Sequence, residues 1–178
     1  MKTRSVVTLI FAVALAAAGT VWIKSLVPPD SPTGSLQFLS AAPELPIFAR
    51  DGRKIDLTKE KDRVLIVHFW ATWCPPCVEE TPALSRYWET IKDRGDISLY
   101  AISVDKDWKT VDGFLKKNPS SIPLFHDPGA ATAKRFGSTQ YPETYVVNRK
   151  GRVLFRVQGP VDWTNPEVRT RIEQLIAS

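Results

Sequence analysis

Val64 to Phe69 form a nearly continuous apolar run, in which His68 is the only polar residue among six. A short, nearly continuous apolar run is typical of a β-strand covered on both faces, because a strand with one solvated face alternates polar and apolar residues. Trp70 to Trp73 follow, and Cys74 to Cys77 then open a helix-like segment that we expect to end near Asp93. The pattern therefore predicts a central strand that leads directly into a helix.

The same kind of pattern predicts the other elements. Apolar residues on both sides of a turn at Asp51 and Gly52 predict a hairpin over Leu45 to Leu57. Pro82 removes a helical hydrogen bond and is expected to kink the first helix. The remaining elements are expected at Ile97 to Val104 (strand), Trp108 to Lys117 (helix), Ile122 to Phe125 (strand), Ala130 to Phe136 (helix), Glu143 to Val147 and Arg152 to Val157 (hairpin), and Pro166 to Ala177 (amphipathic helix). This order predicts an α/β fold with a mixed central sheet flanked by helices.

The first 27 residues have the composition of a membrane-targeting segment. Two positive charges precede Ser5 to Ile23, a run of 19 residues without charge. As a helix, that run would reach roughly 28 Å, close to the hydrocarbon thickness of a bilayer. An AxA-like site at Ala16 to Ala18 would instead suit a cleaved signal peptide. Because apolar residues continue to Ile23, we favour an uncleaved anchor over residues 1–27, with the rest of the chain outside the cytoplasm.

The composition of the rest of the chain indicates one exported domain behind a linker. Residues 28–44 carry four prolines among small and polar residues, which is typical of a tether. Residues 45–178 are long enough for one domain with a hydrophobic core. The net charge of +5 is spread along the chain without a cluster of like charge, so we expect no binding to nucleic acid.

Cys74 and Cys77 are the only cysteines of the chain, and they lie three residues apart at the predicted start of a helix. A purely structural disulfide is disfavoured, because a loop this short would restrict the unfolded chain very little. A zinc site is disfavoured because His68 and His126 lack the paired spacing of a zinc motif. The N–H groups at a helix start stabilise a thiolate. The pair therefore predicts reversible thiol–disulfide exchange, with no metal and no cofactor.

The motif FWATWCPPC, the helix with Glu80 and Pro82, and the later segment YPETYVVNRKG resemble one family. This is the TlpA, ResA and cytochrome c biogenesis (CcmG, also called DsbE) group of membrane-anchored, extracytoplasmic thioredoxin-like oxidoreductases. The resemblance covers residues 45–178. It implies a thioredoxin-like fold in which the family-typical extra helix and strand correspond to Trp108 to Phe125, behind the predicted N-terminal hairpin.

The cysteine positions and the resemblance together assign roles to the two thiols. Cys74, at the mouth of the helix, is expected to be the attacking thiolate. Cys77 lies one turn further in, and we expect it to be more covered and to act as the resolving thiol. In the resembled family a proline at the position of Pro142 is cis and faces the cysteines, so we expect a cis Tyr141–Pro142 bond.

The same region is expected to bind the client. The backbone before Pro142 can pair with an extended client segment, as in strand addition. Side chains next to the sulfurs would add selectivity, and we expect Trp73 to cover the sulfurs. The expected substrate-binding residues are Trp73, Pro75, Pro76, Tyr141 and Pro142.

Glu80 and His68 are the candidate proton-handling groups. Glu80 lies three residues after Cys77, on the same face of the helix, and matches a glutamate of the resembled family. We expect it to be a partly buried proton acceptor with a raised pKa; an ordinary acid near a helix start is the alternative. His68 stands where ordinary thioredoxins carry a buried aspartate. A hydrogen-bonded core histidine is favoured there over a proton relay.

Taken together, these features predict a protein-disulfide reductase at the bacterial cytoplasmic membrane, with its catalytic domain outside the cytoplasm. By resemblance, the client is expected to be apocytochrome c during cytochrome c maturation, and a transmembrane thiol donor would restore the reduced enzyme. Alternatives of the same class are a reductant for copper-assembly proteins and a general periplasmic reductase. An alternative of another class is a copper-binding chaperone that would use both cysteines and His126.

Overall fold

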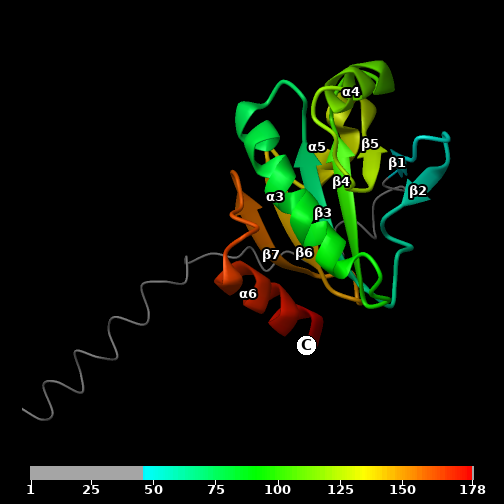
Figure 1. Ribbon diagram of the computed structural model, residues 1–178. Coiled ribbons are helices and arrows are strands. Elements are labelled where there is room, and N and C mark those ends of the chain that lie inside the picture. Colours follow the sequence, from blue (N-terminus) through cyan, green and yellow to red (C-terminus); the bar gives the residue numbers. More distant parts are fainter. Residues whose placement is uncertain (1–45, 178) are drawn as a thin grey trace, which may run out of the picture. The chain divides into compact units, whose positions relative to one another are not determined.

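The computed structural model describes residues 46–177, and Figure 1 shows a sheet with helices packed against it. The seven strands have the order β2-β1-β5-β4-β3-β6-β7. The strands are β1 (Pro46–Phe48), β2 (Lys54–Asp56), β3 (Val64–Trp70), β4 (Ile97–Ser103), β5 (Leu124–His126), β6 (Glu143–Val147) and β7 (Val153–Gln158). The helices are α3 (Pro75–Ile91), α4 (Trp108–Leu115), the 3-10 turn η2 (Pro128–Ala130), α5 (Ala131–Arg135) and α6 (Pro166–Ala177). The predicted α/β class with a mixed sheet is confirmed.

Strand β3 lies in the middle of the sheet, and all of its residues are buried. It pairs in parallel with β4 and antiparallel with β6. Successive side chains of a strand point to opposite faces, and β3 divides its residues accordingly. Val64 and Ile66 belong to the core on one face of the sheet, whereas Leu65, Val67 and Phe69 belong to the core on the other. The prediction that this strand is central and covered on both faces is confirmed.

The first of these cores holds α3 and α6 against the sheet. Leu84 of α3 and Ile172 and Leu175 of α6 are buried in it. Figure 1 shows both helices on the same side of the sheet, with α3 running back alongside β3 from the end of that strand. The apolar face that predicted the amphipathic C-terminal helix is therefore the face that attaches α6 to the sheet.

Both predicted hairpins are present, and one predicted strand is displaced. β1 and β2 pair antiparallel through a turn in which Gly52 has a φ of 83°, and β6 and β7 form the second hairpin. The strand expected at Ile122 to Phe125 is wrong in its bounds, since β5 begins at Leu124. Pro123 has no N–H for the ladder, and Ile122 is buried in the core instead.

Helix α3 begins directly after Cys74, with Pro75 and Pro76 in its first turn, and continues through Pro82 as one element. Prolines are tolerated at the first positions of a helix, where their missing N–H groups would have no helical partner. Directly before Pro82, the Thr81 hydroxyl group donates to the Cys77 carbonyl oxygen at 2.7 Å. The kink that was expected at Pro82 stays a prediction.

The predicted anchor over residues 1–27 and the predicted linker over residues 28–44 lie outside the described residues. Within residues 46–177, none of the helices has both the length and the apolar character needed to span a bilayer.

The docking of α3 on the sheet predicts a large effect of one core substitution. Leu84 is fully buried between α3 and the sheet, so Leu84→Ala should lower the free energy of unfolding by about 2–5 kcal/mol. Denaturant unfolding of the oxidised protein measures this change. The control is Arg86→Ala on the exposed face of α3, which should change the value by less than about 0.5 kcal/mol. Equal midpoints for both variants would contradict the described packing.

Candidate active site

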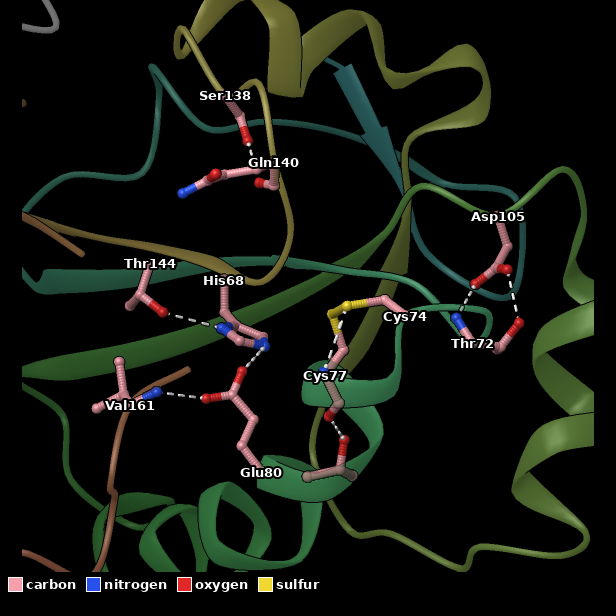
Figure 2. The surroundings of a disulfide bond; sticks show 11 residues. His68, Thr72, Cys74, Cys77, Glu80, Asp105, Ser138, Gln140, Thr144 and Val161 are labelled. Carbon is pink, nitrogen blue, oxygen red and sulfur yellow. Dashed lines mark hydrogen bonds and ion pairs between the residues drawn. A yellow bond between two sulfur atoms is a disulfide. The ribbon is translucent and has the colours of Figure 1, made fainter. Parts of the chain in front are cut away.

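Cys74 and Cys77 form a disulfide at the start of α3, with their Cα atoms 5.3 Å apart. Figure 2 shows the pair at the end of the helix that follows β3. Cys74 is 5% exposed and Cys77 is fully buried, so the expectation that the second cysteine is the more covered one is confirmed. This asymmetry leaves Cys74 as the sulfur nearer to solvent.

The start of α3 provides a donor for the Cys74 sulfur. Cys74 is the N-cap residue of the helix, and the Cys77 N–H points at its Sγ atom across 3.4 Å. A helix N-terminus carries unpaired N–H groups and a partial positive charge, both of which stabilise a thiolate. The helix start therefore directs an N–H donor at the sulfur that would be a thiolate in the reduced protein.

A buried aspartate fixes the loop that leads into the disulfide. Asp105 is 1% exposed and accepts hydrogen bonds from the Thr72 N–H at 3.0 Å, the Thr72 hydroxyl at 2.7 Å and the Ser103 hydroxyl at 2.8 Å. It therefore holds Thr72, two residues before Cys74, against the end of β4. Our sequence interpretation missed Asp105; the available signal was an acid at the carboxyl end of a strand that neighbours β3.

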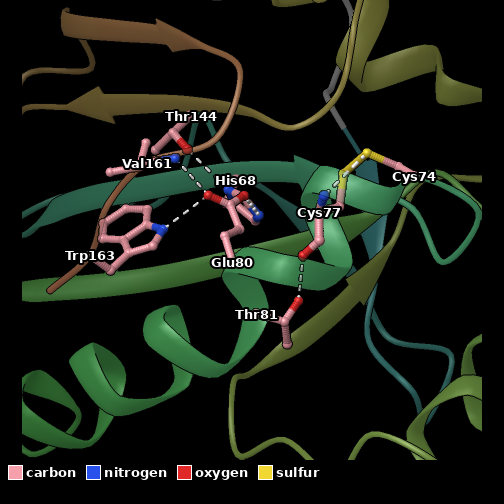
Figure 3. Close-up of polar contacts among 8 residues, drawn as sticks. All are labelled: His68, Cys74, Cys77, Glu80, Thr81, Thr144, Val161 and Trp163. Carbon is pink, nitrogen blue, oxygen red and sulfur yellow. Dashed lines mark hydrogen bonds and ion pairs between the residues drawn. A yellow bond between two sulfur atoms is a disulfide. The ribbon is translucent and has the colours of Figure 1, made fainter.

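Glu80 is buried on the first turns of α3, and its carboxyl group faces the segment after β7. Its Oε2 atom accepts hydrogen bonds from the Val161 N–H at 2.7 Å and from the Trp163 indole N–H at 3.3 Å (Figure 3). Burial raises the pKa of Glu80 to about 7, and these two hydrogen bonds oppose the rise. The expected burial and raised pKa of Glu80 are confirmed. By contrast, the neighbouring Glu79 is exposed.

His68 lies on β3 next to the Glu80 carboxyl group. Its Nδ1 atom is 3.0 Å from the Thr144 hydroxyl oxygen on β6, and its Nε2 atom is 3.3 Å from Oε1 of Glu80. Burial lowers the pKa of His68 to about 3, so the ring is neutral at neutral pH. The expectation of a hydrogen-bonded core histidine is confirmed. Its contact with Glu80 was not predicted, because it depends on how α3 docks on β3.

The residues expected to bind the client come together at the same end of the sheet. The Tyr141–Pro142 peptide bond is cis, as expected. The Tyr141 ring packs edge-on against the Trp73 ring at a centroid distance of 6.0 Å. Trp73 is 65% exposed, and Pro75 and Pro76 are also exposed. An apolar surface therefore borders the disulfide, with the loop before β6 beside the loop before α3.

Buried groups hold the cis-proline loop in place. The Pro142 carbonyl oxygen accepts from the Gly159 N–H at 2.9 Å. The Glu143 carboxylate is fully buried and binds the Arg156 guanidinium, which also donates to the Gly137 carbonyl oxygen at 3.0 Å. Both ends of the loop from Gly137 to Glu143 are thus tied to β7 and the residue that follows it.

The ligand set of the proposed copper chaperone is not assembled. Among the described residues there is no group of three or more His, Cys, Asp or Glu side chains arranged to hold a metal ion. His126 contacts the Asp105 carbonyl oxygen through its Nε2 atom at 2.7 Å and packs against the ring of Trp108. The Nε2 atom of His126 therefore contacts the backbone rather than the cysteines.

Comparisons with known proteins agree with this geometry. The family model described as Redoxin matches residues 30–172. A thiol-disulfide oxidoreductase ResA from Bacillus thuringiensis is 27% identical over 118 residues, which are 66% of this chain and 68% of the relative. A thiol:disulfide interchange protein DsbE homolog from Paracoccus denitrificans is 34% identical over 119 residues, which are 63% of each chain.

The comparison with solved structures concerns the fold. The crystal structure of StoA from Bacillus subtilis matches with a TM-score of 0.58 at 23% identity, over 67% of this chain and 95% of that one. This likeness confirms the expected thioredoxin-like fold. Because the Redoxin model spans most of the sequence and relatives named as thiol-disulfide oxidoreductases align with the region of the disulfide, the chain belongs to the Redoxin family, as a thiol-disulfide oxidoreductase of the ResA and DsbE type.

Proposed function

We propose that this oxidoreductase reduces disulfides of client proteins outside the cytoplasm, with Cys74 as nucleophile, Cys77 as resolving thiol and Glu80 as proton acceptor. One observation carries the proposal: a buried carboxyl group with a pKa near 7 lies one turn after a fully buried cysteine. A structural disulfide needs no such group. A thiol that must lose its proton in a buried site does need one.

The proposed reaction has two exchange steps. The Cys74 thiolate attacks a client disulfide, so that a Cys74–client disulfide forms and the first client sulfur leaves as a thiolate. The Cys77 thiolate then attacks the Cys74 sulfur and expels the second client sulfur. The client gains two electrons, and the enzyme ends in the disulfide form that Figure 2 shows. A dithiol donor returns two electrons by the same steps in reverse.

In this proposal Glu80 accepts the proton that Cys77 loses before the second step. Cys77 is fully buried, so its thiolate is costly to form unless its proton has a nearby acceptor. A carboxyl group with a pKa of about 7 is ionised in a substantial fraction of molecules at neutral pH and can take that proton. The raised pKa brings the proton affinity of the Glu80 carboxylate closer to that of a thiolate. Proton transfer from Cys77 to Glu80 is therefore less unfavourable.

The apolar surface beside the disulfide suits an extended client segment. In this proposal the backbone before Pro142 pairs with the client, while Trp73, Pro75, Pro76 and Tyr141 contact its side chains. The exposed ring of Trp73 is a large apolar group that client binding would remove from water.

The proposal also includes where the protein is located and which client it reduces. The uncharged run over Ser5 to Ile23 supports a single-pass anchor in the bacterial cytoplasmic membrane, with the domain in the periplasm or its equivalent. The resemblance of PETYVVNRKG to the cytochrome c biogenesis branch supports apocytochrome c as the client and a transmembrane thiol protein as the donor. Copper-assembly proteins are the alternative clients, and client identification separates the two.

Glu80→Gln should slow the resolving step at pH 7 by about 100-fold, the lower end of typical general-base contributions. Glutamine preserves size and hydrogen-bond acceptance but cannot take the proton. In the wild type the step should accelerate as pH rises through about 7, because the base must be ionised, and the variant should lose this rise. The measurement is the rate of peptide release from a preformed Cys74–peptide disulfide.

Glu79→Gln is the matched control, since Glu79 is the exposed neighbour on the same helix. It should keep both the wild-type rate and the wild-type pH profile. If Glu80→Gln behaves like this control, Glu80 is not the proton acceptor.

A Cys77→Ser variant of the full-length chain should trap the client in its native host, because Cys74 can still attack but nothing resolves the mixed disulfide. Mass spectrometry of the captured disulfide partner is expected to identify apocytochrome c. The Cys74→Ser, Cys77→Ser double variant should capture nothing. Recovery of copper-assembly proteins without apocytochrome c would overturn the client assignment and leave the chemistry intact.

A further inference from the structure

The two oxygens of the Glu80 carboxyl group have different surroundings. Oε2 accepts two hydrogen bonds, from the Val161 N–H and the Trp163 indole N–H. Oε1 is buried, makes no hydrogen bond of good geometry within the described residues, and has the Nε2 atom of His68 at 3.3 Å. An oxygen that already accepts two N–H groups has little capacity to carry a proton as well. A proton on Glu80 therefore belongs on Oε1, where it faces His68.

His68 is a neutral ring between two oxygens. It is 1% exposed, and its Nδ1 and Nε2 atoms face the Thr144 hydroxyl and Glu80 Oε1, respectively. A neutral imidazole has one N–H and one bare nitrogen, so it can donate to only one of these oxygens at a time. A hydroxyl group can rotate to donate or to accept, which allows Thr144 to satisfy either arrangement.

We propose that His68 is a positioning residue whose tautomer follows the protonation of Glu80. When Glu80 is protonated, Oε1–H donates to a bare Nε2, and Nδ1–H donates to the Thr144 hydroxyl oxygen. When Glu80 is ionised, Nε2–H donates to Oε1, and the Thr144 hydroxyl donates to a bare Nδ1. Every polar atom of the chain from Glu80 to Thr144 then has a partner in both states, and no second charge is buried.

The proton count balances in this exchange. Protonation of Glu80 adds one proton to the pair, whereas His68 keeps one ring proton and changes only which nitrogen carries it. In net terms one proton enters the pair on Oε1 while the ring proton changes from Nε2 to Nδ1, and the Thr144 hydroxyl group keeps its own proton in both states. The inference rests on the proposed role of Glu80, because the switch matters only if that carboxyl group exchanges protons during the reaction.

The surrounding groups support a neutral ring. In Figures 2 and 3 the His68 ring lies beside the Glu80 carboxyl group, on the side toward Cys77. The other titratable groups near the pair are Cys77 on α3 and Tyr87, whose ring stacks on Trp163. Glu143, which precedes Thr144 on β6, is bound to Arg156. None of these contacts supplies His68 with a second carboxylate that would stabilise an imidazolium.

Nitrogen NMR of the oxidised full-length chain, labelled with ¹⁵N at histidine, tests this inference. Only His68 and His126 contribute signals, and the disulfide removes the titration of Cys77. As pH rises through about 7, the His68 proton should move from Nδ1 to Nε2 while the ring stays neutral. The His126 signals are told apart from those of His68 by its Nε2 atom, which faces the Asp105 carbonyl oxygen, a group that can only accept a hydrogen bond.

Variants of the two partners sharpen the result. Glu80→Gln should abolish the exchange, because its amide does not titrate. Thr144→Val should move the exchange to lower pH, because the tautomer that pairs with a protonated Glu80 would then bury an Nδ1–H group without an acceptor. Thr144→Ser keeps the hydroxyl group and should retain the exchange, which separates the loss of the hydroxyl from a general effect of substitution at this site.

One tautomer across the whole titration of the wild-type protein, or an imidazolium that forms near pH 7, would overturn the inference. Neither result would change the effect of Glu80→Gln on the resolving step, so the proposed function would stand on its own measurement. Conversely, a tautomer exchange in a protein whose resolving step is insensitive to Glu80→Gln would support the switch and contradict the role of Glu80 in the reaction.

Discussion

The burial of the Glu80 carboxyl group is the constraint on which the chemistry of this site depends. A carboxylate loses favourable hydration when it is buried, so the pKa of Glu80 rises to about 7 even though hydrogen bonds oppose the rise. Two donors oppose the rise at Oε2, while Oε1 is left facing a neutral histidine. Because the compensation is only partial, Glu80 is present in both its ionised and its protonated form near pH 7. This suits a group that accepts a proton from a thiol.

The fold supplies this environment from separate parts of the chain. β3 carries His68 and leads into the disulfide, and α3 turns Glu80 back toward that strand (Figure 3). The segment after β7 brings a backbone N–H and an indole ring from more than 80 residues away in sequence. The Asp105 carboxylate and the Glu143–Arg156 pair fix the loops on either side of the sulfurs. The result is a buried acid on the helix that carries the disulfide and an exposed apolar ring, Trp73, beside the sulfurs.

Local patterns in the sequence were sufficient to predict the elements and the two thiols. The apolar run of β3, the CxxC pair and the spacing of Glu80 depend on residues close together in sequence, and the structure agrees with each. The hydrogen bond from Val161 could not be predicted, because every residue except proline has a backbone N–H. The His68–Thr144 pair depends on the register between β3 and β6, which residue types alone do not determine. β5 begins later than predicted because Pro123 has no N–H to donate to the ladder, although its carbonyl oxygen accepts from the Ala101 N–H of β4 at 3.2 Å.

The most direct test of this account is the carboxyl ¹³C titration of Glu80 in the oxidised protein, assigned by comparison with Glu80→Gln. The account predicts a midpoint near pH 7, well above the ordinary glutamate value of 4.5, because burial outweighs the two hydrogen bonds at Oε2. A Glu80 carboxyl group that stays ionised down to the ordinary glutamate range would contradict the central claim that a buried acid is poised to exchange protons beside the disulfide.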